Sequence, residues 1–345
     1  MMNESVKWYE KAGKESDVVC STRVRLARNL KSYPFPDRAN LRQKKEIEEK
    51  VRGALMSAGG LMPGKFEFAE LSSLSNEVAV SMVERHLVSP GFISGIEGKA
   101  LLISDDESIS IMINEEDHIR IQVIKEGFCP KETFEAADRI DSLMKLDYAF
   151  DDELGYLTQC PTNLGTALRV SVMMHLPALT EYNVISRMAS NLSKLGITIR
   201  GTYGEGTKVS GAMYQMSNQV TLGLTENEAL ENLAAIAGQV IAEERQCRGI
   251  MIKNIGVQDK IVRSAGLLKS ARIMSGYEFM DLISYVRLGI SAGILSGITH
   301  AEINKLITDV QSATLMTKAG KQLGQAERNI LRAQRVREIC KKIEE

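Results

Sequence analysis

The chain has 345 residues, is 44% hydrophobic, and balances 43 Lys and Arg residues against 44 Asp and Glu residues. This balance gives no global attraction for nucleic acid or for an anionic membrane surface, and no apolar run is long enough to span a membrane. The five cysteines are widely spaced and include no CxxC pair. They argue against a disulfide framework or a zinc site and predict a cytoplasmic protein with reduced thiols, in agreement with an N-terminus that lacks the apolar core of a signal peptide.

The first predicted strand carries two arginines. Residues 18–26 alternate like a half-buried strand, so Arg23 and Arg25 share one face. Neighbouring arginines repel each other unless an anion lies between them, although acidic neighbours on a solvated face would also explain the pair. A helix is predicted at 40–58, and a second one runs towards His86. A lone histidine in that place is more often a cap or a core group than a ligand.

An acidic turn follows, within a predicted hairpin. Residues 114–120 read NEEDHIR, and residues 108–113 and 119–124 alternate on either side of them. Period-two alternation is typical of half-buried strands, so the acids lie where the two strands join. Taken alone, this cluster is most simply explained as a solvated surface turn.

Two further loops, at 155–166 and 201–207, lie among the predicted elements after the hairpin. In chain order they are a helix at 131–146, a turn-rich stretch at 155–166 that holds Cys160, a strand at 167–174, a helix at 181–195, a strand at 197–200, a glycine-rich loop at 201–207 and a strand at 217–223. Cys160 precedes a proline in an irregular segment, where a thiol is either exposed and reactive or buried and inert. Three glycines in the second loop suggest a close backbone approach or a sharp bend.

The chain becomes helical after residue 225. Thr225, Ser275 and Thr299 each precede a glutamate by three residues, which is the capping box of a helix start. We place a boundary near residues 250–258 and predict a catalytic domain at 1–254 and a helical domain at 255–345.

Four segments bring arginines that could converge: Arg23 with Arg25, Arg120, Arg169 and Arg200. Guanidinium groups bind phosphate oxygens bidentately, so such a cluster suits a polyphosphate, while the nearby glutamates suit a cation or a basic substrate. This combination predicts phosphoryl transfer from a nucleotide to a basic acceptor. The sequence has no GxxxxGK[ST] loop, no HRD and DFG pair, and no GxGxxG that opens a helix after a strand, so arginines would have to hold the nucleotide.

Four motifs in this order carry a family resemblance: STRVR at 21–25, NEEDHIR at 114–120, CPTNLGTALR at 160–169 and RGTYGE at 200–205. The chain resembles the phosphagen (guanidino) kinases, and most closely the bacterial protein arginine kinases. The resemblance runs over residues 17–223, with further similarity in the C-terminal domain. It implies an α+β fold with a curved, mostly antiparallel sheet flanked by helices, followed by a helical C-terminal domain.

The resemblance also implies roles for individual residues. Glu116 is the expected general base, Glu205 the second carboxylate on the guanidinium, and Cys160 the thiol that helps to position it. Asp117 is expected to reach Mg²⁺ through water. The residues expected around ATP are Ser21, Thr22, Arg23, Val24, Arg25, His86, Arg120, Arg169, Val170, Ser171, Val172, Met173, Arg200, Gly201, Thr202, Tyr203, Gly204 and Glu205.

Two departures from the small-molecule kinases bear on the substrate. Those enzymes carry a helical lid domain before the first motif, whereas here that motif begins at Ser21, so we expect an open site that suits an arginine on a protein surface. The C-terminal domain of protein arginine kinases typically carries an RDxxRA motif that binds phosphoarginine as an allosteric signal. This chain reads RNILRA instead, so the expected pocket of Arg328, Asn329, Arg332 and Ala333 lacks a negative charge. Alternatively, these residues form only the charged face of the last helix.

The leading hypothesis is an ATP-dependent, Mg²⁺-dependent protein arginine kinase that marks proteins for degradation in bacterial stress response and quality control. The alternatives are a kinase of free arginine or another small guanidino compound, and a non-catalytic adaptor that binds phosphoarginine. The expected partners are unfolded proteins or a stress-response repressor as substrates, an activator protein, a Clp-type protease and a second copy of the chain. We expect neither a nucleic acid nor a membrane as a partner.

Overall fold

A computed structural model describes residues 5–61, 64–202 and 209–345. Its main sheet has eight strands in the order β2-β3-β4-β5-β1-β8-β10-β9, and every neighbouring pair is antiparallel. The strands are β1 (Val19–Arg28), β2 (Phe66–Glu70), β3 (Ala100–Ser104), β4 (Ile109–Ile113), β5 (Ile119–Glu126), β8 (Leu168–His175), β9 (Ile197–Gly201) and β10 (Met213–Asn218). A separate short hairpin joins β6 (Phe150–Asp151) to β7 (Gly155–Tyr156). The predicted α+β class is confirmed.

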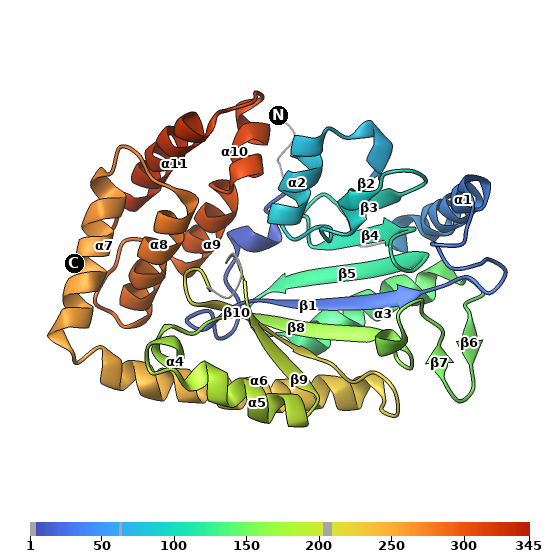
Figure 1. The fold of residues 1–345 in the computed structure, drawn as a ribbon, viewed down its shortest axis with the longest axis horizontal. Coiled ribbons are helices and arrows are strands. Elements are labelled where there is room, and N and C mark those ends of the chain that lie inside the picture. Colours follow the sequence, from blue (N-terminus) through green and yellow to red (C-terminus); the bar gives the residue numbers. More distant parts are fainter. Residues whose placement is uncertain (1–4, 62–63, 203–208) are drawn as a thin grey trace.

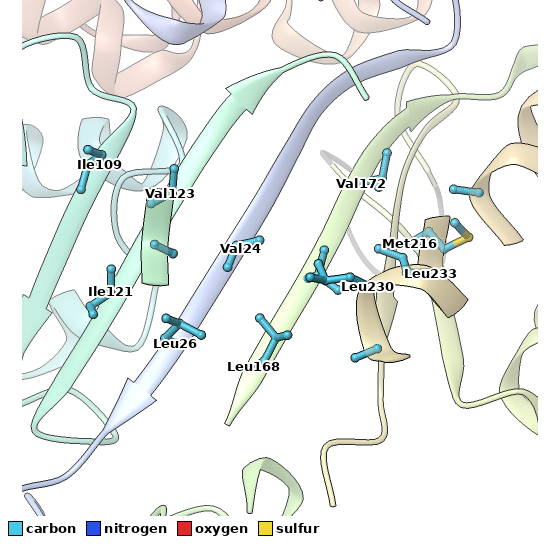
Figure 2. Close-up of a cluster of buried hydrophobic side chains, with 14 of the residues drawn as sticks. Val24, Leu26, Ile109, Ile121, Val123, Leu168, Val172, Met216, Leu230 and Leu233 are labelled. Atoms are coloured by element: carbon cyan, nitrogen blue, oxygen red, sulfur yellow. The ribbon is translucent and has the colours of Figure 1, made fainter. Parts of the chain in front are cut away.

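Helices cover one face of this sheet (Figure 1). They are α1 (Leu41–Ala58), α3 (Pro130–Met144), α4 (Pro177–Glu181), α5 (Val184–Lys194) and α6 (Glu226–Met251). Val24 and Leu26 of β1 pack with Ile121, Leu168 and Leu230 in the core between the sheet and these helices (Figure 2). Because side chains alternate along a strand, Arg23 and Arg25 face the other side.

That other face is covered only in part. Around α2 (Asn76–Glu84), a small apolar cluster that includes Leu87, Phe92 and Met112 packs over the β3 and β4 side of the sheet. Beside the sheet lie the C-terminal helices: α7 (Ile255–Ser270), α8 (Gly276–Ser291), α9 (His300–Asp309), α10 (Ser312–Ala319) and α11 (Gln325–Cys340) (Figure 1). The central strands keep a polar face, which holds the predicted site residues.

The C-terminal helices share a core with the rest of the chain. Cys20, Ala178 and Met213 belong to the same buried cluster as Ile261, Phe279 and other residues of α7–α11. The predicted boundary at 254 and 255 falls in the short connection between α6 and α7. The division into two domains remains a prediction.

Two predicted elements differ from the structure. The helix expected at 181–195 begins at Val184, because Asn183 adopts a left-handed conformation with φ 55° and separates it from α4. The last strand, expected at 217–223, is Met213–Asn218. It ends there because the Asn218 side chain bonds to β8 itself, accepting from Val170 N at 2.9 Å and donating to Leu168 O at 3.0 Å.

Candidate active site

The centre of the polar face is a group of arginines on neighbouring strands. Arg25 on β1 lies directly opposite Arg169 on β8, and Arg23 lies opposite Ser171. Like charges opposite each other destabilise a sheet. Burial, and then the charges of Arg23, Arg120 and Arg169, lower the pKa of Arg25 well below its ordinary value, and its buried Nε lacks a hydrogen-bond partner within the described residues. This arrangement favours the binding of an anion.

The acidic turn between β4 and β5 lies against this group. Glu115 is the structural partner of Arg120, because its buried carboxylate lies 2.5 Å from the Arg120 guanidinium and accepts from Ser89 Oγ at 2.5 Å. Glu116 accepts from Arg120 Nη2 at 2.9 Å, but its side chain is 39% exposed. Glu116 is therefore the carboxylate of the turn that remains available to a substrate.

One cavity of about 510 Å³ brings the predicted groups together. Its predicted members are Arg25, Glu116, Arg120, Cys160, Arg169, Arg200, Gly201 and Thr202. Other residues that line it were not predicted, namely Ala27, Thr162, Asn163, Ala167, Thr198, Gln215 and Ser217. Thr162, Asn163 and Ala167 lie within a quoted motif, so they could have been named, whereas Gln215 lies on the strand that was placed too late. Gln215 accepts from Arg23 Nη2 at 2.8 Å and so orients that arginine.

A second cavity of about 370 Å³ adjoins the first, since Arg25 and Arg120 line both. It also contains Arg23 and His86, with Val83, Val88 and Met112 as apolar walls. Burial, and then the charge of Arg23, lower the pKa of His86 to about 4, so its ring is neutral at pH 7. A polar arginine edge beside apolar walls and a neutral ring suits a nucleotide, with phosphates on one side and the base on the other.

Some of the residues predicted around ATP point away from these cavities. Val24, Val170 and Val172 are fully buried in the core on the helix-covered face, and the Thr22 hydroxyl donates to Gly127 O at 2.7 Å. Strand alternation explains the difference, because every second residue of each motif faces the core. The side chains of these four residues do not line either cavity, and their place in the ATP site stays a prediction. Ser21, Ser171 and Met173 do line small hollows beside His86.

The loop that carries Cys160 forms another wall of the first cavity. Cys160 is partly exposed, and its sulfur lies 3.1 Å from Thr162 Oγ1. Arg169 donates to Asn163 Oδ1 at 3.3 Å in the same loop, which links the thiol segment to the arginine group. The predicted residues Tyr203, Gly204 and Glu205 lie outside the described residues.

Asp117 occupies a different position from its neighbours in the turn. Its side chain is fully buried, and its Oδ1 accepts from Asn29 Nδ2 at 2.7 Å and from Gln159 N at 2.9 Å. Its Oδ2 is buried without a hydrogen-bond partner among the described residues. Asp117 lines neither cavity, so a contact with Mg²⁺ would have to run through a water molecule at Oδ2, and this role stays a prediction. Across the described ranges, no group of three or more His, Cys, Asp or Glu side chains could hold a metal ion directly.

The predicted phosphoarginine pocket lies on α11. Arg332 is 2% exposed, and its guanidinium donates to Val310 O, Met274 O, Asn329 Oδ1 and Ser312 Oγ. Asn329 thus uses its carbonyl to orient Arg332. Ala333 is fully buried, and Arg328 donates to Leu323 O at 2.8 Å. In this conformation Arg332 joins three helices and a loop, so a phosphoarginine would have to compete with these internal bonds.

Comparisons with known proteins agree with this geometry. The family model of the ATP:guanido phosphotransferase C-terminal catalytic domain matches residues 46–247, and that of the protein-arginine kinase McsB C-terminal domain matches residues 254–345. A lombricine kinase structure superimposes with a TM-score of 0.57 at 25% identity, covering 71% of this chain and 72% of its own. A duplicated taurocyamine kinase from Schistosoma mansoni with bound transition state analog components gives 0.58 at 27% identity, over 77% of this chain and 38% of its own.

The chain belongs to the ATP:guanido phosphotransferase family, because the family model and the superimposed structure match it. The arginine group that lies against a carboxylate on this sheet agrees with that assignment. The full-length relatives narrow the family further. A protein-arginine kinase of Clostridium novyi is 44% identical over 98% of this chain and 99% of its own, and one of Caldanaerobacter subterraneus is 44% identical over 93% and 96%. The chain belongs to the protein-arginine kinases. No helix among the described residues is long and apolar enough to cross a membrane.

Proposed function

We propose that this chain transfers the γ-phosphoryl group of ATP to the guanidino group of arginine residues in proteins. The observation that supports it most is a single cavity lined both by Arg25, Arg120 and Arg169 and by Glu116 and Cys160. The arginines would neutralise the phosphate oxygens, and the glutamate would meet the incoming guanidinium. Catalysis of phosphoryl transfer is mostly alignment and charge stabilisation of this kind.

Glu116 is proposed to take a proton from the substrate guanidinium. An arginine side chain is protonated at neutral pH, so its nitrogen has no free lone pair for attack. Glu116 accepts one N–H proton as that nitrogen forms a bond to the γ-phosphorus, while the bond from this phosphorus to the bridging oxygen breaks and ADP leaves. Glu205 is proposed to hold the other guanidino nitrogen, and Cys160 to align the group. Mg²⁺, bound with ATP and reached through water by Asp117 Oδ2, would supply further neutralisation of phosphate charge.

Mass spectrometry of an incubated protein substrate tests this function. The purified enzyme, ATP, Mg²⁺ and a denatured protein should yield phosphoarginine, detected under non-acidic conditions that preserve the N–P bond. Glu116→Gln should reduce the rate at least about 100-fold, because general-base catalysis and alignment are both lost, while the Kd for ATP stays close to wild type. Phosphate found only on free arginine would instead support a small-molecule kinase. Loss of ATP binding in the variant would contradict the role of Glu116.

Regulation and partners are proposed on the family likeness alone. We propose a homodimer formed through the C-terminal helices, a phosphoarginine pocket at Arg328 and Arg332, and an activator protein and a Clp-type protease as partners in stress response. The Arg332 guanidinium already donates to four internal acceptors, so the pocket is tested by measuring the Kd for phosphoarginine directly. The non-catalytic adaptor would stand instead if phosphoarginine bound and no protein were phosphorylated.

A further inference from the structure

One buried carboxylate oxygen connects the two loops that would flank the substrate. Asp117 follows Glu116 in the acidic turn, and its Oδ1 accepts from the backbone N–H of Gln159, the residue before Cys160, at 2.9 Å. Nothing else in the described structure bonds the turn to the N–H of Gln159. The carboxylate therefore links the segment with the general base to the segment with the thiol.

Further hydrogen bonds, made by Asn29 and His118, keep Asp117 in place. Asn29, immediately after β1, donates to the same Oδ1 at 2.7 Å and to Leu157 O at 3.0 Å, and its own Oδ1 accepts from His118 N at 2.9 Å. His118 accepts from Leu30 N at its Nδ1 and lies 2.8 Å from Pro34 O at its Nε2. Two backbone partners of opposite kind define a neutral ring with its proton on Nε2. The turn, the end of β1 and the Cys160 loop are thus joined into one rigid unit.

We propose that Asp117 is a positioning residue for the arginine substrate, which fixes the separation of Glu116 and Cys160 through its Oδ1. The proposal rests on the proposed function, because it concerns how that site holds a guanidinium. It assigns to Oδ1 a task distinct from the water-mediated approach of Oδ2 to Mg²⁺. The β1 strand that carries Arg23 and Arg25 ends at Arg28, and Asn29 follows it directly. The hydrogen bonds of Asn29 therefore also set the acidic turn and the Cys160 loop relative to the proposed phosphate site.

Two substitutions, Asp117→Asn and Asp117→Ala, separate the task of Oδ1 from that of Oδ2. Asp117→Asn keeps one carbonyl oxygen, and the side-chain amide can turn that oxygen towards the two N–H donors. The link to Gln159 is then kept, while an amide nitrogen, which donates, takes the place of Oδ2. Asp117→Ala removes both oxygens and leaves the buried N–H groups of Asn29 and Gln159 unpaired. A displacement of about 1 Å in a reacting group can reduce a rate about 100-fold.

The experiment measures phosphorylation of an arginine peptide together with the alkylation rate of Cys160, mapped by mass spectrometry. Asp117→Ala should raise KM for the peptide, lower kcat/KM about 100-fold and raise the alkylation rate of Cys160 severalfold. Asp117→Asn should keep the wild-type peptide KM and alkylation rate and alter only the dependence on Mg²⁺. If Asp117→Asn raised the peptide KM as much as Asp117→Ala does, or if Asp117→Ala left both values unchanged, the proposal would be overturned.

A matched control lies on the neighbouring hairpin. Asp106 also braces a turn of the sheet with one carboxylate oxygen, which accepts from Ser104 Oγ at 2.7 Å and from Ser108 N at 3.0 Å. Asp106→Ala should leave the peptide KM and the alkylation of Cys160 unchanged, and equal effects from both alanine variants would reduce the role of Asp117 to general stability. The alkylation arm needs no catalysis. If the wild-type chain phosphorylates no protein, while Asp117→Ala alone accelerates the alkylation of Cys160, the proposed function is refuted and the link between the two loops stands.

Discussion

Three arginines on β1 have two different tasks, and the position of each along the strand decides which. Arg23 and Arg25 face the open side, whereas Arg28 is an odd number of residues away and faces the helices. Its guanidinium is 3% exposed, bonds Asp141 on α3 at 2.7 and 2.8 Å, and lies 3.6 Å from the centre of the Tyr156 ring. Arg28 is therefore a structural cation that holds β1 to α3, and it is excluded from the phosphate site.

Removing the partner of Arg28 should destabilise the protein strongly. Asp141→Ala leaves a buried guanidinium without its counter-charge and also deprives Tyr148 Oη of its acceptor, which lies at 2.8 Å. Breaking a buried pair in this way typically lowers the free energy of unfolding by about 3–5 kcal/mol. Urea unfolding measures the change. The double variant Arg28→Met with Asp141→Leu should recover much of the loss, and a cost below about 1 kcal/mol for Asp141→Ala would show that the pair is solvated.

At the scale of elements, alternation along the sequence predicted the β4–β5 hairpin and the arginine face of β1. It did not give the register between strands that are distant in sequence. That Arg25 meets Arg169 and that Gln215 meets Arg23 depend on β1, β8 and β10 lying in this order, which no local pattern encodes. The hydrogen bond from Gln159 N to Asp117 could not be predicted either, because it joins two segments that are distant in sequence and neither segment's local pattern indicates the other.

The contact between α2 and α10 connects the second cavity to the C-terminal helices. Glu84, the last residue of α2 and a wall of that cavity, accepts from Ala313 N at 2.9 Å and from Thr314 N at 2.7 Å at the start of α10. A carboxylate at a helix N-terminus satisfies free N–H groups and interacts favourably with the helix dipole. Arg332 donates to Ser312 Oγ at this same helix start. The cavity proposed for the nucleotide and the predicted phosphoarginine pocket thus meet at one helix terminus.

Hydrogen exchange tests how far α10 depends on Glu84. Glu84→Ala should raise amide exchange in residues 312–319 about tenfold, since the loss of a cap costs about 1–2 kcal/mol and this helix is short. Glu228→Ala instead removes the carboxylate that accepts from Thr225 N at the start of α6, and it should leave exchange in α10 unchanged. Equal protection of α10 in the Glu84 variant and the wild type would mean that packing alone holds this helix.

At the scale of the whole molecule, the N-terminal segment ties the sheet to the C-terminal helices. Lys305 on α9 pairs with Glu10, and Arg287, which is 1% exposed on α8, donates to Ser16 O at 2.7 Å. Asp17 bonds Arg245 and Arg248 on α6, and its backbone oxygen accepts from Ser291 Oγ at 3.2 Å. No local sequence pattern predicts these contacts, because the partners of this segment lie more than 200 residues away.

Asp17 should make this connection dependent on pH. Burial would raise its pKa, but the bonds from Arg245 and Arg248 outweigh burial and lower it to about 2. A lowered carboxylate pKa stabilises the fold above the unfolded-state value of about 4, and this contribution is lost as the pH falls towards 2. Asp17→Asn should therefore lower Tm by about 2–4 °C at pH 7, and the difference from wild type should shrink once the pH drops below about 4. Calorimetry between pH 7 and pH 3 measures it. Because Arg248 is nearly buried and needs this partner, a pH-independent difference would indicate that packing of the segment, and not the charge of Asp17, holds the two parts together.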